Sequence, residues 1–462
     1  MTIFIGSEEI DLTPSLLERY DVPGPRYTSY PTAPQWTDSF GPVDAERVLV
    51  RSNEDGRPLS LYSHLPYCEQ LCLFCGCNVI VRRNHDQTEP YLATLKQEIA
   101  ALAERIDPTR EVVQSHWGGG TPTYFSPEQL DDLFTFMRER FRFADDAEIG
   151  VEIDPRVTSI EHLATLRRLG FNRLSMGVQD FDPEVQKAVR RVQPYEMVRE
   201  MVDACRDLGF DSVNLDLIYG LPLQSAASMS ATLEQVLSLD PDRIALFSYG
   251  HVPWIKKYQQ VLTDLLPTRD EKFSIFITAI SALTGAGYTY VGMDHFARPE
   301  DELCVAQRNG SLHRNFQGYT TKAGADLLGA GVTSIGEIGR AYTQNFRDMG
   351  SWRGAVESGR LPIMRGVELT DDDVIHRAAI SAILCQTVLD KQSFSQTYGV
   401  DVDAYFADAI SRLAPLREDG LVEVTDTAIR ATGIGRVFLR NIAMAFDAYL
   451  APSDHPMYSR TL

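Results

Sequence analysis

Four of the seven cysteines lie within ten residues, in the segment "CEQLCLFCGC" that runs from 68 to 77. Thiols packed this closely could form a disulfide framework, hold a zinc ion or hold an iron–sulfur cluster. Cys68, Cys72 and Cys75 have the spacing C-x3-C-x2-C, and Cys77 follows two positions later. A structural zinc site wants four ligands, usually as two pairs from separate segments. A cluster held by three thiolates instead leaves one iron open to an external ligand.

The other three cysteines supply no second pair for zinc. Cys205, Cys304 and Cys385 lie apart in apolar contexts, and we expect each of them to be a small buried hydrophobic residue. The odd total of seven disfavours a disulfide framework. A zinc knot made of the four neighbouring cysteines would be cramped, but it stays open as an alternative.

Composition sets the class of protein. The chain has 462 residues, a hydrophobic content of 44% and a formal net charge of -20, which are typical of a globular protein with one large and one smaller domain. No segment approaches the roughly 18 apolar residues of a membrane helix, and the N-terminus turns acidic too early for a secretory signal. We therefore expect a cytoplasmic protein with no membrane partner, in a compartment where disulfides are rare.

The negative charge also argues against nucleic-acid binding, which favours a basic stripe. A DNA-binding role for the C-terminal part fails for the same reason, because "DDDVIHRAAISAILCQTVLDKQ" offers few cations to phosphate. An anionic substrate would instead need a local island of Arg, Lys or His to overcome the field of the chain.

Short apolar runs alternate with segments of helical period, which is the pattern of βα units around a parallel sheet. We expect six strands, at 59–66, 112–118, 147–153, 173–179, 212–220 and 243–250. We expect helices between them, at 90–105, 127–141, 160–169, 183–208 in two pieces, and 228–239. Six such units are too few for a closed barrel and predict an α/β fold with a partial, three-quarter parallel βα barrel.

Three domains follow from this pattern. We expect a partly extended N-terminal extension over 1–55 that contributes to the substrate site, a catalytic barrel over 56–365 and a smaller, mainly helical C-terminal domain over 366–462. A helix at 269–287 leads into "YTYVGMDHFARP", which would add a strand at the edge of the sheet. The segment "TDDD" indicates a helix start. Near the C-terminus a hairpin followed by a helix is expected, as in winged-helix folds.

Catalytic groups of parallel barrels lie at the carboxyl ends of the strands. The expected ends read "PYCEQLC", "GGGTP", "EIDPR", "QDF", "DLIYG" and "SYGH", and all are rich in polar residues or glycine. The three glycines of "WGGGTPT" indicate close backbone approach to a ligand or, alternatively, a tight turn. Asp216 lies in an apolar strand and needs a partner there, which a purely structural hydrogen bond could also supply.

A C-x3-C-x2-C loop at the end of the first barrel strand resembles the motif of the radical S-adenosylmethionine (SAM) enzymes. The resemblance implies a [4Fe–4S] cluster held by Cys68, Cys72 and Cys75, with the amine and carboxylate of SAM on the open iron. An electron from the cluster would break a C–S bond of SAM and release the 5′-deoxyadenosyl radical. The glycine segment would cup the aminocarboxylate of SAM, and Phe74, just before the last of these cysteines, could pack on the adenine.

Longer segments resemble one family within this superfamily. They are "YSHLPYCEQLCLFCGCNVI", "HWGGGTPTY", "EIDPR", "GFNRLSMGVQDF", "DLIYGLP", "GMDHFARP", "LHRNFQGYTT" and "FLRNIAMAFDAYL". Together they resemble the oxygen-independent coproporphyrinogen III oxidases (coproporphyrinogen dehydrogenases) of bacterial haem biosynthesis, from about Pro23 to about Leu450. The resemblance implies that two propionate side chains of coproporphyrinogen III become vinyl groups, giving protoporphyrinogen IX, with one SAM consumed in each turnover.

The same resemblance implies roles for individual residues. Cys77 belongs to the family signature without being a cluster ligand. Two SAM molecules are implied; the first would contact Tyr62, Gly119, Glu152, Gly250 and Ile335. The second would contact Phe74, Gly120, Thr121, Gln179, Arg191 and Asp216. Relatives often carry Ala at position 250, and Gly preserves a small residue at which a backbone contact would survive.

The substrate of this family carries four carboxylates, so the acidic chain would need cations near the barrel mouth. The candidates lie in the family-like segments and are Arg26, His295, Arg298, His313 and Arg314. Arginine suits them because it binds carboxylates in a bidentate way. The resemblance also implies a reductant protein such as flavodoxin or ferredoxin, and an electron acceptor that the sequence does not identify. Nothing in the sequence demands a further protein partner, and a monomer is expected.

Two other functions compete with this one. A related haem chaperone shares the radical SAM core and the C-terminal domain without oxidising the substrate; Cys77 and the N-terminal "PGPRYTSYPT" disfavour it, because such chaperones typically lack both. A simple iron–sulfur electron carrier would need a fourth ligand and would not need six polar strand ends. The sequence therefore favours the oxidase.

Overall fold

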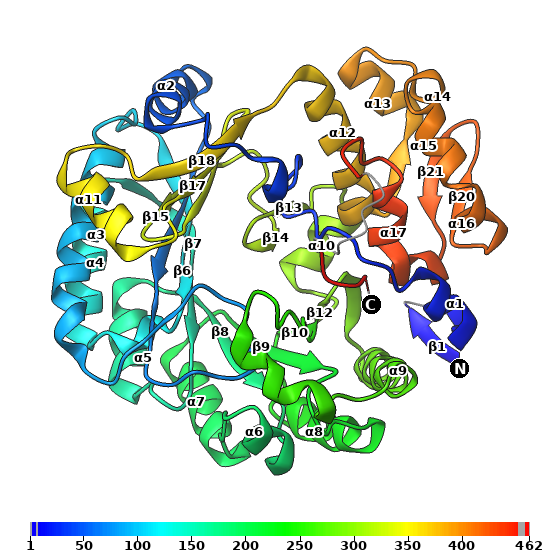
Figure 1. Ribbon diagram of the computed structural model, residues 1–462, viewed down its shortest axis with the longest axis horizontal. Helices are drawn as coiled ribbons and strands as arrows, with labels where there is room; N and C mark the ends of the chain where they lie inside the picture. Colours follow the sequence, from blue (N-terminus) through cyan, green and yellow to red (C-terminus); the bar gives the residue numbers. More distant parts are fainter. Residues whose placement is uncertain (1, 6–7, 451–457, 462) are drawn as a thin grey trace. The chain divides into compact units, whose positions relative to one another are not determined.

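The computed structural model describes residues 2–5, 8–450 and 458–461 (Figure 1). Contacts divide the chain into two compact units. Unit 1 consists of Met1–Gln35, Leu217–Ala323 and Leu369–Leu462, and unit 2 consists of Trp36–Asp216 and Gly324–Glu368. Each unit thus combines segments that lie far apart in the sequence. The domain limits at 55/56 and 365/366 stay a prediction.

Unit 2 contains the parallel strands that the sequence predicts. They are β3 (Leu59–Leu65), β6 (Glu111–Gly119), β7 (Arg142–Ile153), β8 (Arg173–Gln179) and β9 (Ser212–Tyr219), which ends in unit 1. β3, β6, β7 and β8 pair in parallel in this order, with Tyr62 opposite His116 and Glu152 opposite Ser175. The carboxyl ends of these strands therefore meet at one edge of the sheet.

The helices of unit 2 also lie where the sequence predicts them. They are α3 (Thr88–Ala103), α4 (Pro127–Arg138), α5 (Ile160–Leu169), α6 (Pro183–Ala188) and α7 (Tyr195–Leu208). α3, α4, α5 and α7 pack in succession along the sheet (Figure 1). Ser126 and Ser159 cap the starts of α4 and α5 with capping boxes, and Gly170 ends α5 at a φ of 103°.

Four further strands of unit 2 are missing from the sequence-based prediction. They are β15 (Asp326–Ala330), β16 (Ile335–Ile338), β17 (Ala341–Asn345) and β18 (Ile363–Glu368). β15 pairs in parallel with β3, and β16, β17 and β18 continue the sheet in antiparallel order. Unit 2 also contains α2 (Pro42–Ser52) and α11 (Met349–Glu357).

A buried carboxylate holds this added part of the sheet to α3. Glu98 is 2% exposed and accepts hydrogen bonds from the Gly331 amide and Trp352 Nε1, both at 2.8 Å, and from Asn345 Nδ2 at 2.5 Å. These donors come from the β15–β16 connection, β17 and α11. Burial raises the pKa of Glu98 to about 7, although the three hydrogen bonds act in the opposite direction.

Unit 1 combines the N-terminal segment, the last parallel strand and the C-terminal domain. Its middle segment contains α8 (Ala226–Ser238), β10 (Arg243–Ser248), α9 (Arg269–Gly285), β11 (Thr289–Gly292), β12 (His295–Ala297), α10 (Glu302–Arg308), β13 (His313–Asn315) and β14 (Gly318–Thr320). β12 pairs with β10 and β11, both antiparallel. The predicted edge strand is therefore confirmed as the pair β11 and β12.

The C-terminal part of unit 1 is mainly helical. It contains α12 (Asp371–Ser381), β19 (Val388–Asp390), α13 (Lys391–Tyr398), α14 (Val402–Tyr405), α15 (Ala407–Arg412), α16 (Ala414–Glu418), β20 (Val422–Val424), β21 (Ala428–Ala431) and α17 (Leu439–Met444). Thr370 caps α12 in front of three aspartates, as predicted. β20 and β21 form the expected hairpin, and α17 is the helix that follows it.

The N-terminal segment is more regular than the partly extended stretch that the sequence predicts. It contains the strand pair β1 (Thr2–Ile5) and β2 (Glu8–Asp11) and the helix α1 (Pro14–Tyr20). Within unit 1, Tyr27 donates to Asp447 and Arg19 pairs with Asp419, so the two ends of the chain are joined. In the part of the chain that the structure describes, no helix combines the length and the apolar character that a membrane-spanning helix requires.

Candidate radical SAM site

The cysteine loop, residues 67–78, directly follows β3. Its start, β4 (Tyr67–Cys68), pairs in parallel with β5 (Ile80–Val81) just beyond its end. In its middle, the Leu73 amide donates to the Val189 carbonyl at 2.9 Å. All seven cysteines of the chain are thiols, and Cys205, Cys304 and Cys385 are buried as predicted.

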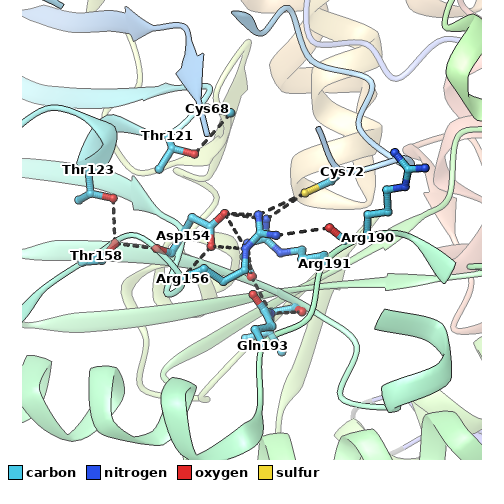
Figure 2. A network of polar contacts seen from close by, with 12 residues as sticks. Cys68, Cys72, Thr121, Thr123, Asp154, Arg156, Thr158, Arg190, Arg191 and Gln193 are labelled. Atoms are coloured by element: carbon cyan, nitrogen blue, oxygen red, sulfur yellow. Dashed lines mark hydrogen bonds and ion pairs between the residues drawn. The ribbon is translucent and has the colours of Figure 1, made fainter. Parts of the chain in front are cut away.

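Cys72 accepts hydrogen bonds from two guanidinium groups (Figure 2). Arg156 Nη2 lies 3.3 Å and Arg191 Nη1 lies 3.5 Å from the Cys72 sulfur. The same two nitrogens donate to Asp154 Oδ2, at 2.6 Å and 3.0 Å. Burial alone would raise the pKa of Asp154, but Arg191 and Arg156 hold it below its usual value. The two cations and one anion leave a net positive charge beside the Cys72 sulfur.

The other cysteines of the loop influence one another. The Cys68 sulfur lies 3.5 Å from Thr121 Oγ1 (Figure 2). Burial raises the pKa of Cys68 to about 12, and the charges of Cys75 and Cys72 act in the same direction. Cys77 is exposed, and a hydrogen bond with Cys75 raises its pKa. A positively charged group would therefore be needed to hold these neighbours as thiolates together.

The glycine segment at the end of β6 packs against the chain itself. A Cβ on Gly119, whose φ is +118°, would lie 2.7 Å from the His64 ring, and a Cβ on Gly120 would lie 2.5 Å from the Pro66 carbonyl oxygen. The Gly120 amide donates to the Leu65 carbonyl at 2.9 Å. Close backbone approach is thus observed, and its partner is the flank of the cysteine loop. The glycines hold the ends of β3 and β6 together.

Glu152, at the end of β7, lies next to this segment. The Gly119 amide donates to its Oε2 at 3.2 Å, and His116 Nε2 lies 3.5 Å from its Oε1. Burial would raise the pKa of Glu152, but His116 and the Gly119 amide hold it below its usual value. Tyr62 stacks on His116 with ring centroids 6.3 Å apart. An ionised carboxylate in this place can accept hydrogen bonds from a cationic amine.

Asp216 on β9 has the partners that its apolar strand requires. Ser175 Oγ donates to it at 3.0 Å and Asn214 Nδ2 at 2.7 Å. Burial raises the pKa of Asp216 to about 7, and the charge of Glu152 acts in the same direction. The structural hydrogen bonds that the sequence left as an alternative are therefore present.

The candidate SAM residues gather in one unit. Unit 2 contains Tyr62, Phe74, Gly119, Gly120, Thr121, Glu152, Gln179, Arg191, Asp216 and Ile335 together with the whole cysteine loop, whereas Gly250 belongs to unit 1. Gln179 ends β8 with a φ of 68°, and Ile335 begins β16. A Cβ at Gly250 would meet no atom within 4 Å, so this position has room for an alanine.

The candidate substrate cations all belong to unit 1. Three of them, the half-buried Arg26, His295 and Arg314, lie together with the buried Arg440, and we call these four residues the cationic patch. The His295 ring lies 5.3 Å from the ring of Tyr319, and the guanidinium of Arg314 lies over the same ring at 5.0 Å. Arg26 pairs with Asp294, which precedes His295.

Positive charge exceeds negative charge in this patch. Burial lowers the pKa of Arg26 to about 9, and the charges of Arg440 and Arg314 lower it further. Burial and the charges of Arg314 and Arg26 lower the pKa of His295 to about 3. Arg314 Nε and Nη1 and His295 Nδ1 are buried without a hydrogen-bond partner among the described residues. Such orphaned donors are rare in proteins unless a ligand satisfies them.

The other two candidate cations have different surroundings. Arg298 pairs with Asp240, and its guanidinium lies over the ring of Tyr288 at 4.3 Å. His313 begins β13, beside Arg314 in the sequence, and pairs in register with Thr320 of β14. The structure thus brings Arg26, His295 and Arg314 together and leaves the Arg298 guanidinium outside the patch.

Comparisons with known proteins find matches over nearly the whole chain. The Radical SAM superfamily model matches residues 62–236, and the HemN C-terminal domain model matches residues 369–438. An oxygen-independent coproporphyrinogen III oxidase of Salmonella typhimurium is 46% identical over 447 residues, covering 96% of this chain and 97% of the relative. The Helicobacter pylori protein of the same name is 45% identical over 448 residues, covering 96% of this chain and 98% of the relative.

A solved structure matches just as fully. The Escherichia coli coproporphyrinogen III oxidase (HemN), described as a radical SAM enzyme, superposes with a TM-score of 0.91 at 45% identity, covering 96% of this chain and 100% of the other. The chain belongs to the oxygen-independent coproporphyrinogen III oxidase family. It is therefore a radical SAM enzyme with a mixed α/β fold, a parallel-sheet core and a helical C-terminal domain.

Radical SAM membership implies a [4Fe–4S] cluster and SAM, and the residues present fit both. Three neighbouring thiols beside the Arg156 and Arg191 guanidiniums suit an iron–sulfur cluster, whose thiolate ligands need compensating positive charge. In the described part of the chain, no three Cys, His, Asp or Glu side chains gather around a single ion position. A cluster does not require that, because each thiolate binds an iron of its own.

Sequence reasoning missed several residues that contact the candidate site residues or act on them electrostatically. Asp154 and Arg156 lie in the segment "EIDPR", whose position at a strand end was the available signal. Asp294 stands in "GMDHFARP", directly before a candidate cation. Arg440 is different, because it donates to the carbonyls of Gly24 and Pro25, more than 400 residues away, and nothing in the local sequence indicates such a contact.

Proposed function

We propose that this protein catalyses the anaerobic oxidative decarboxylation of two propionate side chains of coproporphyrinogen III to vinyl groups, giving protoporphyrinogen IX in the haem biosynthesis of the cytoplasm. Family membership supports the reaction class. The observation that carries the substrate is the cationic patch, because its buried nitrogens without partners and its excess positive charge suit carboxylates.

Cys68, Cys72 and Cys75 would hold the cluster. When bound, it supplies the electron that cleaves SAM to methionine and the 5′-deoxyadenosyl radical. Cys77 is not a ligand in this proposal. Arg156 and Arg191 donate hydrogen bonds to the Cys72 sulfur, and their shared contact with Asp154 fixes both guanidiniums in place. The Gly119 and Gly120 backbone keeps the Cys68 end of the loop against β6.

Two SAM molecules would bind in the site. Glu152 accepts hydrogen bonds from the ammonium group of the first, for which its lowered pKa keeps it ionised. The other contacts of the first SAM would be Tyr62, Gly119, Gly250 and Ile335. The second SAM would use Phe74, Gly120, Thr121, Gln179, Arg191 and Asp216. Asp216, whose pKa burial raises to about 7, would be ionised only in part at neutral pH and could donate as well as accept hydrogen bonds.

The cationic patch orients the substrate. Arg314, Arg26 and His295 bind propionate carboxylates, and the candidate contacts Arg298 and His313 bind at its margin. Each reacting propionate loses a hydrogen atom from its β-carbon to the deoxyadenosyl radical. It then loses CO2, and one electron passes to an acceptor of unknown identity, which leaves a vinyl group. A protein such as flavodoxin or ferredoxin supplies the electron that starts each turnover.

The finer architecture belongs to the same proposal. The six βα units would form a three-quarter parallel barrel over 56–365, preceded by the extension 1–55 that contributes to the substrate site. The domain over 366–462 would have a winged-helix-like fold, which the hairpin of β20 and β21 followed by α17 supports. The protein would act as a monomer.

A product assay tests this function. The holoenzyme is reconstituted without oxygen and supplied with SAM, dithionite, coproporphyrinogen III and a cell-extract acceptor, and tetrapyrroles and 5′-deoxyadenosine are followed by mass. The proposal predicts loss of two CO2 with a matching amount of 5′-deoxyadenosine. If 5′-deoxyadenosine forms but the tetrapyrrole does not change, coproporphyrinogen III is not the substrate. If a cluster-loaded protein forms neither product, the result favours the haem chaperone.

A further inference from the structure

A cavity of about 770 Å³ opens beside the cysteine loop, entirely within unit 2. Cys68 and the three residues that follow it form one side, and Thr121 and Asp154 lie in its wall. The remaining lining consists of residues 81–83, after the loop, of Arg156 and Val157, and of residues 187, 190, 192 and 197, at the end of α6 and beyond it. The cavity thus borders a proposed cluster ligand.

Cations dominate the lining of this cavity, which we call the basic pocket. Five lining residues are basic and two, Glu69 and Asp154, are acidic; the basic ones are Arg82, Arg83, Arg156, Lys187 and Arg190. This local excess stands out in a chain with a net charge of -20. A surface of opposite sign to the rest of a protein attracts partners that the whole molecule would repel.

Three of these cations have no acidic partner. Arg156 pairs with Asp154 and Lys187 pairs with Glu184. Arg82, Arg83 and Arg190 are exposed and form no ion pair with any residue that the structure describes. Exposed arginines of an acidic protein easily find carboxylates, so three unpaired ones around a single pocket point to an external anionic surface.

Arg190 is also held in an unusual backbone conformation. Its φ is 57°, in the left-handed region that is unfavourable for a residue with a side chain. The Arg190 amide donates to the Lys187 carbonyl at 3.1 Å, and Arg156 Nη1 donates to the Arg190 carbonyl at 3.4 Å. The Arg190 guanidinium points away from the Asp154 network (Figure 2). The backbone is thus tied to the Cys72 network while the charge stays available to a partner.

We propose that the basic pocket is the docking site of an acidic protein that donates single electrons. The inference rests on the proposed cluster at Cys68, Cys72 and Cys75. The rate of electron transfer falls steeply with distance, so a donor must bring its redox group close to a cluster ligand, and Cys68 is the ligand that the pocket exposes. In the transfer the donor loses one electron and the cluster gains one.

Arg82, Arg83 and Arg190 form the rim of the basic pocket, and their charges set the rate at which the electron donor associates with the enzyme. Complementary charge raises the association rate of two proteins by about 10- to 1,000-fold at low salt, and the gain disappears as salt screens it. Val192, which is 56% exposed in the same lining, supplies an apolar contact at the interface. Arg82, Arg83 and Arg190 therefore select an acidic donor and exclude the basic proteins of the cell.

The test uses the reconstituted holoenzyme with a flavodoxin as the acidic probe and a ferredoxin as a second probe. The three rim variants are Arg82→Glu, Arg83→Glu and Arg190→Glu. The control is Arg417→Glu, which reverses the charge of an exposed, unpaired arginine of unit 1. The dissociation constant of each probe is measured at low and high salt, and the rate at which the reduced probe reduces the cluster is followed by absorbance. Deoxyadenosine formation with dithionite, a small reductant that needs no docking, is measured in parallel.

The proposal predicts that each of the three rim variants weakens flavodoxin binding and slows cluster reduction by about tenfold or more at low salt. The loss shrinks at high salt, and Arg417→Glu binds as the wild type does. Equal binding by all four variants, or salt-independent binding of both probes, would overturn it. Failure of the proposed function is distinguishable, because it removes the tetrapyrrole product, with or without dithionite-driven deoxyadenosine, and leaves probe binding intact.

Discussion

The two units treat buried charge in opposite ways. In unit 2, buried ions are matched: Arg110 pairs with Asp326, both 2% exposed, and Asp154 lies between two arginines. In unit 1, the cationic patch has the carboxylate of Asp294, which pairs with Arg26, and the charge of Asp21, which acts on Arg440. Its Arg314 Nε and Nη1 and His295 Nδ1 atoms are buried and lack partners among the described residues. Uncompensated buried charge is costly, so it persists where a ligand uses it.

This difference indicates that the charged residues of unit 2 support the cluster and the sheet, whereas those of unit 1 bind the substrate. The buried ion pairs of unit 2 are complete within the protein. The exceptions in that unit are the positive excess beside Cys72, which suits an anionic cluster, Glu98, whose donors are neutral, and the exposed arginines of the basic pocket. The charges of unit 1 are completed by a substrate with several carboxylates. Changes in unit 2 should therefore affect SAM cleavage or the stability of the sheet, and changes in the patch should affect the tetrapyrrole alone.

The largest effect is expected from Cys72→Ser. Serine does not supply the thiolate that an iron of the cluster needs, so deoxyadenosine formation should fall to background while coproporphyrin III still binds. Iron and sulfide content, the electron paramagnetic resonance signal of the reduced cluster and tetrapyrrole fluorescence measure these outcomes. Cys77→Ser is the matched control and should keep its cluster. Loss of the cluster in Cys77→Ser would instead make Cys77 a ligand, as the four-cysteine knot requires.

A second effect concerns the stability of unit 2. The pKa of Glu98 is raised from 4.5 to about 7 on folding. The stabilisation of the folded state by protonated Glu98 is therefore fully present below pH 4.5 and is lost as the pH rises through 7. The loss is on the order of 3 kcal/mol. Glu98→Gln, which does not ionise, should lack this dependence. Urea titrations at several pH values measure the free energy of unfolding, with the exposed Glu104→Gln as control. A parallel pH profile in wild type and Glu98→Gln would contradict the account.

The smallest effect is expected at Arg298. Asp240 already neutralises its guanidinium, and the ring of Tyr288 lies beneath it. Arg298→Ala should raise the KM for coproporphyrinogen III by only a few-fold, in keeping with the roughly 1 kcal/mol of an exposed charge contact, and should leave SAM cleavage unchanged. Steady-state kinetics, in which the tetrapyrrole product and 5′-deoxyadenosine are both measured, test this prediction. Unchanged substrate kinetics would remove Arg298 from the site and confine substrate binding to the patch.

Much of the fold of unit 2 could be predicted because its signals are local. The strand predicted at 173–179 matches β8 residue for residue, and α5 matches its prediction at 160–169. The strands β15–β18 could not be predicted, since they are short, rich in glycine and polar residues, and become buried only by pairing with β3 and with each other. Tertiary context overrides intrinsic preference in such segments.

The candidate sites divide in the same way. The cysteine loop could be located from spacing alone, because its residues are close in sequence. The patch needed the structure, because Arg26, His295 and Arg440 come from three distant segments. The ion pairs of Asp154 could not be predicted either, since Arg191 is 37 residues away from Asp154 in the sequence. Long-range pairing of charges leaves no periodic trace in a sequence.

The affinity for coproporphyrin III tests the central claim most directly. Fluorescence titration compares wild type with Arg314→Gln, and repeats both with the tetramethyl ester of the porphyrin, which has no carboxylate charge. A charge-assisted hydrogen bond is worth about 1.5–3 kcal/mol, so Arg314→Gln should bind the free acid roughly 10- to 100-fold more weakly. Its affinity for the ester and its deoxyadenosine formation should match those of wild type. Equal affinity of wild type and Arg314→Gln for the free acid would contradict the account.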